Sequence, residues 1–322
     1  MDTLEISTDE AAALARLEPR FGVETVRRRL ALEAAHEARR LSQAVRPLPL
    51  ETWHKTPALI RAALRASGLA GRARVNTRAL RVRENAVTLP RLPAAFGGYT
   101  ILQLSDLHID IEPDFADHLI AHVRPLACDL CVLTGDYRAR TFGRIDATLA
   151  ALARLRAAIA APCFAVLGNH DSLRMVPAME AMGYRVLLNE RTAITHQGAE
   201  IELAGVDDAH HYRTDDVARA AQRMPRDGTA ILLSHTPEPY RAAEAAGFDL
   251  LLCGHTHGGQ LCLPGGIPLI IEARCPRRLA RGAWRHGALA GYTSVGAGAS
   301  IVPARLNCPP EITLHRLRAA KG

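Results

Sequence analysis

The chain has 322 residues, of which 48% are hydrophobic and 23% are charged, a composition that excludes a disordered or fibrous protein and fits a globular one. Aromatic residues make up only 4%, which disfavours stacking on exposed bases, and the net charge of +7 comes almost wholly from arginine, since Lys55 and Lys321 are the only lysines. No signal-type apolar segment opens the chain and no run of 18 apolar residues occurs, so we expect a soluble cytoplasmic protein.

We predict that residues 1–75 form a helical, arginine-rich N-terminal extension. Between residues 23 and 45 the apolar side chains recur with helical spacing, and arginines that include Arg27, Arg28 and Arg29 occupy the rest of the helix surface. A second, shorter helix is predicted from Thr56 onward. Basic amphipathic helices either pack on the parent domain or lie on an anionic membrane surface, and both alternatives stay open here.

Residues 76–322 are predicted to form one domain of the α/β class. Apolar, strand-like runs alternate with alanine-rich helical stretches such as residues 146–161 and 240–246. This alternation is typical of layered domains in which helices cover the faces of a sheet.

Five strand-like runs of this domain end in aspartate, asparagine or histidine. The residues at these exits are Asp106 and His108, Asp136, Asn169 to Asp171, His235, and His255 with His257. Ligands of open α/β sheets bind at the carboxyl ends of strands, so we expect these side chains to converge. Carboxylate, amide and imidazole groups without a thiolate favour manganese, iron or zinc, and their number suits two ions that share a carboxylate. Two such ions can clamp the attacking and leaving oxygens of a displacement at phosphorus.

The order and spacing of these motifs resemble the signature of calcineurin-like metallophosphoesterases over about residues 99–316. The motifs are Asp106-x-His108, Gly135-Asp136, Gly168-Asn169-His170-Asp171, His235 and Gly254-His255-x-His257. Further stretches are similar to one branch, the YkuE/YaeI-like bacterial phosphodiesterases: Gly205-Val206-Asp207-Asp208, His257-Gly258-Gly259-Gln260 and Cys308-Pro309-Pro310-Glu311-Ile312. The resemblance implies a central β-sandwich flanked by helices, and two divalent transition-metal ions, with Mn²⁺ favoured over iron or Zn²⁺.

The resemblance also implies roles for individual residues. One ion would be held by Asp106, His108 and His257, the other by Asn169, His235 and His255, and the carboxylate shared between them would come from Asp136. His170 would face the scissile phosphate as general acid or transition-state stabiliser, and Asp171 would orient His170. A hydroxide that bridges the ions would attack phosphorus in line.

Residues next to these motifs are candidates for substrate contact: Arg138, Arg140, Arg174, Asp207 and Asp208. A guanidinium could hold a second phosphate and an aspartate could bind a sugar, although each residue could equally be a solvated loop side chain or a helix cap. The neighbouring His210 and His211 are read as surface residues.

The expected reaction is hydrolysis of a phosphodiester or a pyrophosphate. Some relatives in the resembling branch cleave UDP-diacylglucosamine, which makes a nucleotide-linked lipid one candidate substrate, met through a peripheral contact with an anionic membrane surface. Two alternatives stay open. One is a non-catalytic scaffold of the same fold, and the other is a nuclease, which the low aromatic content and the lack of a lysine patch disfavour.

Overall fold

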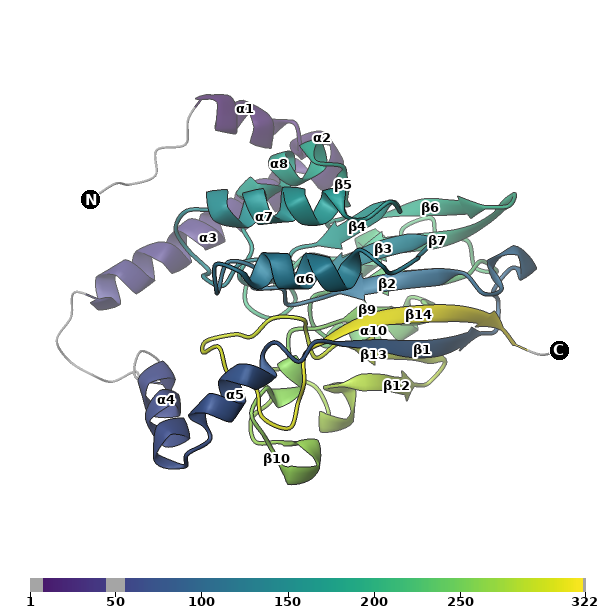
Figure 1. Ribbon diagram of the computed structural model, residues 1–322. Helices are drawn as coiled ribbons and strands as arrows, with labels where there is room; N and C mark the ends of the chain where they lie inside the picture. The colour runs from purple at the N-terminus through teal and green to yellow at the C-terminus, as the bar shows by residue number, and fades with distance from the viewer. Residues whose placement is uncertain (1–7, 45–55, 321–322) are drawn as a thin grey trace.

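Two six-stranded sheets form the centre of the computed structural model, which describes residues 8–44 and 56–320 (Figure 1). The first sheet has the order β1-β14-β2-β3-β4-β5, with bounds β1 (Arg81–Leu89), β14 (Glu311–Ala319), β2 (Thr100–Leu104), β3 (Leu130–Thr134), β4 (Cys163–Val166) and β5 (Tyr184–Val186). The second has the order β12-β13-β9-β8-β7-β6, with bounds β12 (Gly282–His286), β13 (Leu289–Thr293), β9 (Leu250–Cys253), β8 (Ala230–Leu233), β7 (Ala199–Gly205) and β6 (Glu190–His196).

The central strands are largely apolar because both of their faces are covered. In β3, Leu130 and Val132 point into the core between the two sheets, whereas Cys131 and Leu133 point into the layer of helices. Successive side chains of a strand face opposite sides, so a strand buried on both sides reads as a continuous apolar run. This arrangement confirms the predicted layered α/β fold.

Helices cover the outer face of each sheet. The first sheet is covered by α6 (Phe115–Val123), α7 (Asp146–Ala157) and α8 (Val176–Ala181), and the second by the short helices α9 (Val217–Ala220) and α10 (Tyr240–Ala245). Single 3₁₀ turns are η2 (Ala94–Phe96), η3 (Leu173–Met175), η4 (His257–Gly259), η5 (Pro264–Gly266) and η6 (Arg277–Leu279), and a small hairpin pairs β10 (Cys262–Leu263) with β11 (Ile267–Pro268).

The N-terminal extension is helical as expected and packs on the core. Its helices are α1 (Thr8–Ala15), α2 (Glu18–Phe21), α3 (Val23–Ala44), α4 (Thr56–Ala66) and α5 (Ala70–Asn76). Phe21 and Val26 are buried in the cluster that also holds the helices over the first sheet. Packing on the parent domain is therefore the alternative that the structure supports for α2 and α3, whereas the division of the chain at residue 75 stays a prediction. Within the described residues, no helix has the length and apolar character that crossing a bilayer requires.

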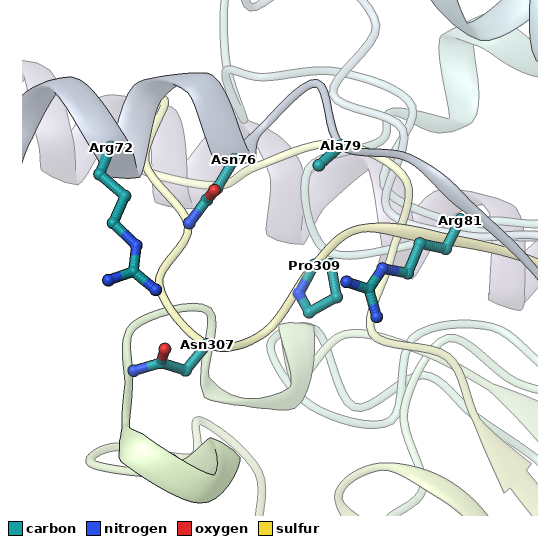
Figure 2. A pocket seen from close by; sticks show the side chains of 6 residues that line it. All are labelled: Arg72, Asn76, Ala79, Arg81, Asn307 and Pro309. Atoms are coloured by element: carbon teal, nitrogen blue, oxygen red, sulfur yellow. The ribbon is translucent and has the colours of Figure 1, made fainter.

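A cavity of about 200 Å³ lies where α5 meets the start of β1 and the segment before β14 (Figure 2). The described residues that line it are Arg72, Asn76, Ala79, Arg81, Asn307 and Pro309. Both arginines are exposed, and the lining contains none of the predicted metal ligands, so this cavity is separate from the predicted site.

A buried polar chain ties the two sheets together at one end. The side-chain amide of Gln103, in β2, donates to the carbonyl oxygen of Cys253, in β9, at 2.9 Å and lies 3.1 Å from Thr134 Oγ1 in β3. Its carbonyl oxygen is 2.9 Å from Nε2 of His315 in β14. Because Cys253 and Thr134 are the last residues of β9 and β3, this chain holds the strand ends that lead into the predicted metal motifs in a fixed relation.

Candidate metal centre

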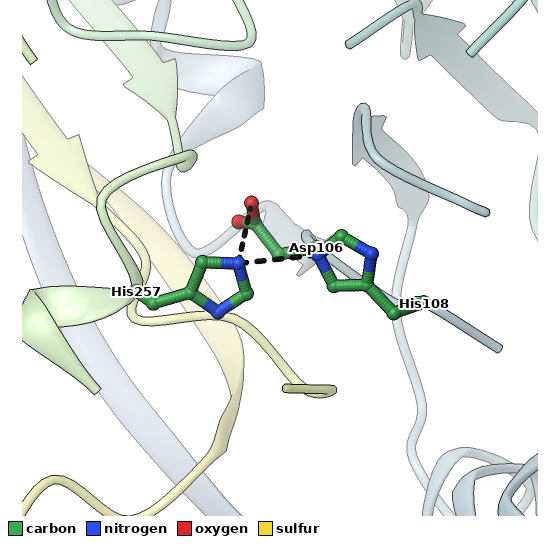
Figure 3. A group of neighbouring side chains, drawn as sticks. All are labelled: Asp106, His108 and His257. Atoms are coloured by element: carbon green, nitrogen blue, oxygen red, sulfur yellow. Dashed lines mark hydrogen bonds and ion pairs between the residues drawn. The ribbon is translucent and has the colours of Figure 1, made fainter. Parts of the chain in front are cut away.

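The predicted metal ligands converge where β2, β3, β4, β8 and β9 end. Among the described residues, two groups of buried side chains each bring their ligand atoms within 4.8 Å of one another. The first group is Asp106, His108 and His257 (Figure 3), and the second is Asp136, His235 and His255. The first group is the set expected for one ion, and the second contains two ligands expected for the other ion together with Asp136, the carboxylate expected to be shared.

In the first group, three ligand atoms face a common point. Nε2 of His257 lies 3.2 Å from Nε2 of His108 and 3.5 Å from Oδ1 of Asp106 (Figure 3). Nδ1 of His108 is 2.6 Å from the carbonyl oxygen of Arg138, to which it must donate, so its Nε2 carries a lone pair toward the group. Several lone pairs directed at one point can coordinate a cation placed there.

The second group has the same character. Nδ1 of His235 donates to the carbonyl oxygen of Thr134 at 2.8 Å, so Nε2 is the nitrogen that points toward the group. That Nε2 lies 3.1 Å from Nδ1 of His255 and 3.0 Å from Oδ1 of Asn169, so the predicted amide ligand joins this group. Nε2 of His255 is buried and has no hydrogen-bond partner among the described residues. These imidazole and amide groups therefore fit a bound cation better than they fit one another.

Asp136 lies between the two groups. Its Oδ2 is 3.4 Å from Nε2 of His235 and 3.9 Å from Nε2 of His108. Although burial opposes ionisation, the positive charge of the neighbouring His235 holds the pKa of Asp136 well below its usual value. An ionised carboxylate in this position can be shared by two ions, as the resemblance implied.

The electrostatics of the site favour positive charge. Burial lowers the pKa of His255 and of His257 well below the usual value, so both rings are neutral and able to bind a metal. Burial also favours the neutral form of His235, but Asp136 and Asp106 outweigh this effect and raise its pKa to about 10. The pocket between the carboxylates thus stabilises a cation, and the residues present fit two metal ions.

The backbone around the ligands is unusual. Five of the seven predicted ligands have a left-handed conformation, with φ of 50° at Asp106, 40° at His108, 57° at Asp136, 71° at His255 and 48° at His257. Residues other than glycine rarely adopt this region, and they keep it where the surrounding structure enforces it, typically at functional sites. The left-handed conformation of these residues therefore directs their side chains toward the two groups.

Two glycines of the motifs are required by close approach. At Gly254, an added Cβ would collide with Oγ of Ser105 and with the carboxylate of Asp106, because the loops after β2 and β9 touch there. At Gly135, where φ is 88°, it would lie 2.6 Å from the backbone nitrogen of Gly168. Glycine lets these loops pack against each other without a side chain between them.

His170 lies beside the two groups and not within them. Its side chain is 18% exposed, and its Nε2 is 4.0 Å from Oδ2 of Asp136. Nδ1 of His170 is 3.4 Å from the hydroxyl of Thr141, a contact that the sequence analysis missed because Thr141 belongs to no motif. A partly exposed ring next to the metal groups can reach a bound substrate, which is compatible with the predicted contact between His170 and the scissile phosphate.

Asp171 has a different role from the one we expected. Its carboxylate accepts hydrogen bonds from the backbone N–H groups of Gly168 at 2.8 Å, Asp136 at 2.7 Å and Tyr137 at 2.9 Å, and its described hydrogen bonds include none to the ring of His170. A fully buried carboxylate needs several donors, and the turn after β3 presents them. Asp171 therefore joins the loop that carries Asp136 to the loop that carries His170, and burial raises its pKa to about 6.

Arg138 was predicted to contact substrate, but it stabilises its own loop. Its guanidinium is 2% exposed and donates to the carbonyl oxygens of Gly143 at 2.8 Å and Thr141 at 3.2 Å. The structure therefore shows internal partners for two of its nitrogens, and the substrate contact of Arg138 stays a prediction. Arg140 is exposed and Arg174 is half-buried, so these two remain candidates.

Asp207 and Asp208 also have internal partners. The carboxylate of Asp207 pairs with Arg29 of helix α3 and accepts a hydrogen bond from Thr214 at 2.6 Å. The carboxylate of Asp208 accepts from the backbone N–H groups that follow it, including those of His211 at 2.7 Å and Tyr212 at 2.6 Å. Both side chains are buried and internally hydrogen-bonded, and their contact with substrate stays a prediction.

His210 is a residue of the site that the sequence analysis assigned to the surface. Its ring centroid lies 4.4 Å from that of His255, and its Nδ1 is 2.7 Å from Oε1 of Glu238. The Asp208 turn brings His210 to this position. In the sequence, its position two residues after Asp208 was the feature that could have indicated a place in the site.

The similarity to known proteins extends over the part of the chain that contains the predicted ligands. The model of the calcineurin-like phosphoesterase family matches residues 99–259, which include all seven predicted ligands. The chain is 31% identical to phosphodiesterase YaeI of Escherichia coli (strain K12) over 235 residues, or 68% of this chain and 82% of YaeI. It is 30% identical to the metallophosphoesterase YkuE of Bacillus subtilis (strain 168) over 276 residues, or 81% of this chain and 94% of YkuE. The metallophosphoesterase YkoQ of the same organism is 30% identical over 230 residues, or 67% of this chain and 83% of YkoQ. The chain therefore belongs to the calcineurin-like phosphoesterase family.

Proposed function

We propose that this protein hydrolyses a phosphodiester or a pyrophosphate with two divalent transition-metal ions, of which Mn²⁺ is favoured. The observation that carries the proposal is the position of the Asp136 carboxylate, 3.4 Å from Nε2 of His235 and 3.9 Å from Nε2 of His108, between two ligand groups. One relative, YaeI of Escherichia coli, is a phosphodiesterase, which supports the diester.

The chain's own residues divide the chemistry among them. Asp106, His108 and His257 would hold one ion, Asn169, His235 and His255 would hold the other, and Asp136 would contact both. When bound, the ions would lower the pKa of a water molecule and neutralise charge on the phosphate. The protein would contribute position and electrostatics, which account for most of the catalysis of phosphoryl transfer.

His170 would act as a hydrogen-bond donor to the reacting phosphate. Burial lowers its pKa, so the ring is neutral near pH 7. We assign the hydroxyl of Thr141, 3.4 Å from Nδ1 of His170, as the donor of this contact, which would place the ring proton on Nε2, the atom that faces Asp136. Of the two roles implied by the family resemblance, this arrangement favours stabilisation of the transition state over proton donation by an imidazolium.

Arg140 and Arg174 would extend the substrate site beyond the scissile phosphate. Both follow metal-binding loops in the sequence, and neither is buried. A guanidinium binds a second phosphate through two parallel hydrogen bonds, so these two residues would distinguish a pyrophosphate from a simple diester.

A lipid-linked substrate is supported by one exposed apolar feature near the metal groups. In the segment 263–270, Leu263, Ile267, Leu269 and Ile270 expose aliphatic side chains, with Ile270 76% exposed. Cys262 is hydrogen-bonded to the carbonyl oxygen of Gly258, so this segment is held against η4, which carries His257. Arg277 and Arg281 donate to the backbone of the same segment. Aliphatic side chains beside arginines are the combination that binds an anionic lipid surface.

A substrate panel tests the proposed reaction. The purified protein would be loaded with Mn²⁺, Fe²⁺ or Zn²⁺ and assayed with bis(p-nitrophenyl) phosphate, UDP-diacylglucosamine, a cyclic nucleotide, a glycerophosphodiester and a monoester. Turnover of a diester or a pyrophosphate is expected. No turnover with any metal would favour the scaffold alternative, and degradation of single-stranded DNA or RNA would favour the nuclease.

Vesicle binding tests the lipid surface separately. Full-length protein should co-sediment with vesicles that contain phosphatidylglycerol and less with neutral phosphatidylcholine vesicles. Replacing Ile267 and Ile270 by serine should weaken this binding while hydrolysis of bis(p-nitrophenyl) phosphate is retained. If replacement of the exposed Arg27 and Arg28 of α3 by glutamate releases the protein and the serine variant does not, the membrane contact belongs to the N-terminal extension.

A further inference from the structure

One buried arginine of helix α3 reaches the back of the metal centre. Arg27, Arg28 and Arg29 are consecutive, and the sequence analysis placed all three on the outside of the helix. In the structure Arg27 and Arg28 are exposed, whereas Arg29 is 1% exposed. Arginine is almost never buried to this extent unless its charge and its donors have partners, so Arg29 must have a specific environment.

The guanidinium of Arg29 contacts two loops of the metal centre at once. One nitrogen, Nη1, forms an ion pair with Asp207. The guanidinium carbon, Cζ, lies over the ring of Tyr212, 3.8 Å from the ring centroid. The other, Nη2, donates to the carbonyl oxygen of Asp171 at 2.9 Å and lies 3.5 Å from that of Gly168. These two carbonyl groups flank Asn169 and His170, so Arg29 holds both ends of the turn that carries them.

Two more residues on the same face of α3 extend this contact. Glu33 accepts hydrogen bonds from the hydroxyl of Ser172 at 2.5 Å and from the backbone N–H of Leu173 at 2.9 Å, and it also pairs with Arg29 at 2.9 Å. Nδ1 of His36 lies 2.6 Å from Nε2 of His211. Positions i, i+4 and i+7 form one stripe of a helix, so a single face of α3 touches both the 168–173 turn and the 207–212 turn.

We infer that Arg29 is a positioning residue of the active site, with Glu33 as its support. It sets the 168–173 turn, which presents Asn169 and His170, in register with the 207–212 turn, which places His210 against His255. The family match covers residues 99–259, so a helix outside the matched segment completes the site. The inference rests on the proposed phosphoesterase function for its kinetic consequence, although the positioning itself can be measured without activity.

Arginine is needed here for geometric reasons. Its planar fork donates in several directions at once, whereas lysine is a point charge on a flexible stem. Removal of the fork would leave Asp207 as a buried carboxylate without its counter-charge and would free the two carbonyl groups of the turn. A displacement of about 1 Å in a reacting group can lower a rate about 10²-fold, so a small shift of this turn would be measurable.

Three variants test the inference: Arg29→Ala, Arg29→Lys and, as a matched control on the exposed side of the same helix, Arg28→Ala. With bis(p-nitrophenyl) phosphate as substrate, Arg29→Ala should lower kcat about 10- to 100-fold and change KM less than about threefold. The kcat of Arg29→Lys should lie between that of Arg29→Ala and that of the unmodified protein. Arg28→Ala should leave both constants unchanged. Elemental analysis at saturating Mn²⁺ should find the same two ions per chain in all three variants.

Hydrogen exchange gives a readout that needs no activity. Amides of the 168–173 turn should exchange faster in Arg29→Ala than in Arg28→Ala, while those of β2 and β3 should not change. Unchanged kcat and unchanged exchange in folded Arg29→Ala would overturn the inference. If Arg29→Ala does not fold, Arg29→Lys and Glu33→Gln decide, because kcat equal to that of the unmodified protein in both would also overturn it. An unmodified protein without activity contradicts the proposed function, and the exchange data still test the positioning.

Discussion

The two ligand groups of the metal centre differ in how they are supported. In the first, His108 is fixed by the carbonyl oxygen of Arg138, and His257 lies 3.2 Å from the fully buried Arg305. In the second, Asn169 is only partly buried, and its turn is held from behind by α3. Every ligand of the first group is fixed within the domain core, whereas one ligand of the second, Asn169, depends on a helix about 140 residues away in the chain. The second ion should therefore be the more loosely held.

The largest effect is expected where the two groups meet. Asp136→Ala removes the carboxylate between them, so both ions should bind weakly and turnover should fall on the order of 10³-fold or more. Activity and metal content by elemental analysis would be measured together. Asp146→Ala, which changes an exposed aspartate at the start of α7, serves as the control and should change neither. Retention of both ions by Asp136→Ala would show that the groups do not share this ligand.

A smaller effect is expected from the residue that lies beside both groups. His170→Ala should keep two ions per chain and lower kcat about 10²-fold, because it removes one hydrogen bond to the transition state. Thr141→Val, which removes the hydroxyl next to Nδ1 of His170, should lower kcat only a few-fold. Loss of an ion from His170→Ala would place this residue among the metal ligands and would contradict its assigned role.

The difference between the groups can be measured directly by removing one ligand from each. Asn169→Ala should weaken the binding of one ion about 10- to 100-fold and leave the other in place, whereas His108→Ala should release the ion that Asn169→Ala retains. Titration of the unmodified protein with a chelator should remove the ions in two steps. A single step, or the loss of both ions from Asn169→Ala, would mean that the groups are supported equally.

The smallest effect concerns the polar chain beneath both groups. Burial lowers the pKa of His315 to about 3, from an ordinary value of 6.5, so the folded protein keeps this ring neutral where the unfolded chain binds a proton. The stabilisation is complete above pH 6.5 and is lost as the pH falls toward 3, at about 1.4 kcal/mol per pH unit. Denaturant unfolding at pH 7 and pH 5, with a chelator present, would measure the total slope, to which other buried histidines with a lowered pKa such as His255 and His257 contribute, and the difference from His315→Gln would isolate the part due to His315. His315→Gln should have a shallower slope, and an equal slope would assign the proton to another group.

The metal ligands could be predicted from the sequence because each follows a strand directly, and because strand ends of an α/β sheet meet at one edge. Asp136, His235 and His257 could be proposed as ligands without knowing the conformation of the loops that carry them. The partners of Asp171 could not be predicted, because they are backbone N–H groups whose direction depends on the turn. Arg29 could not be distinguished from Arg28, because what separates them is the contact with Asp207, 178 residues away.

The left-handed backbone at five of the ligands links metal uptake to the stability of the whole fold. Each such conformation costs about 1–3 kcal/mol, and that energy is supplied by the packing of two sheets and not by the loops themselves. The native chain holds its ligands in place before an ion arrives, so binding requires little rearrangement, while an unfolded chain offers no comparable site. Saturating Mn²⁺ should accordingly raise the Tm, and the gain should grow with the logarithm of the free ion concentration.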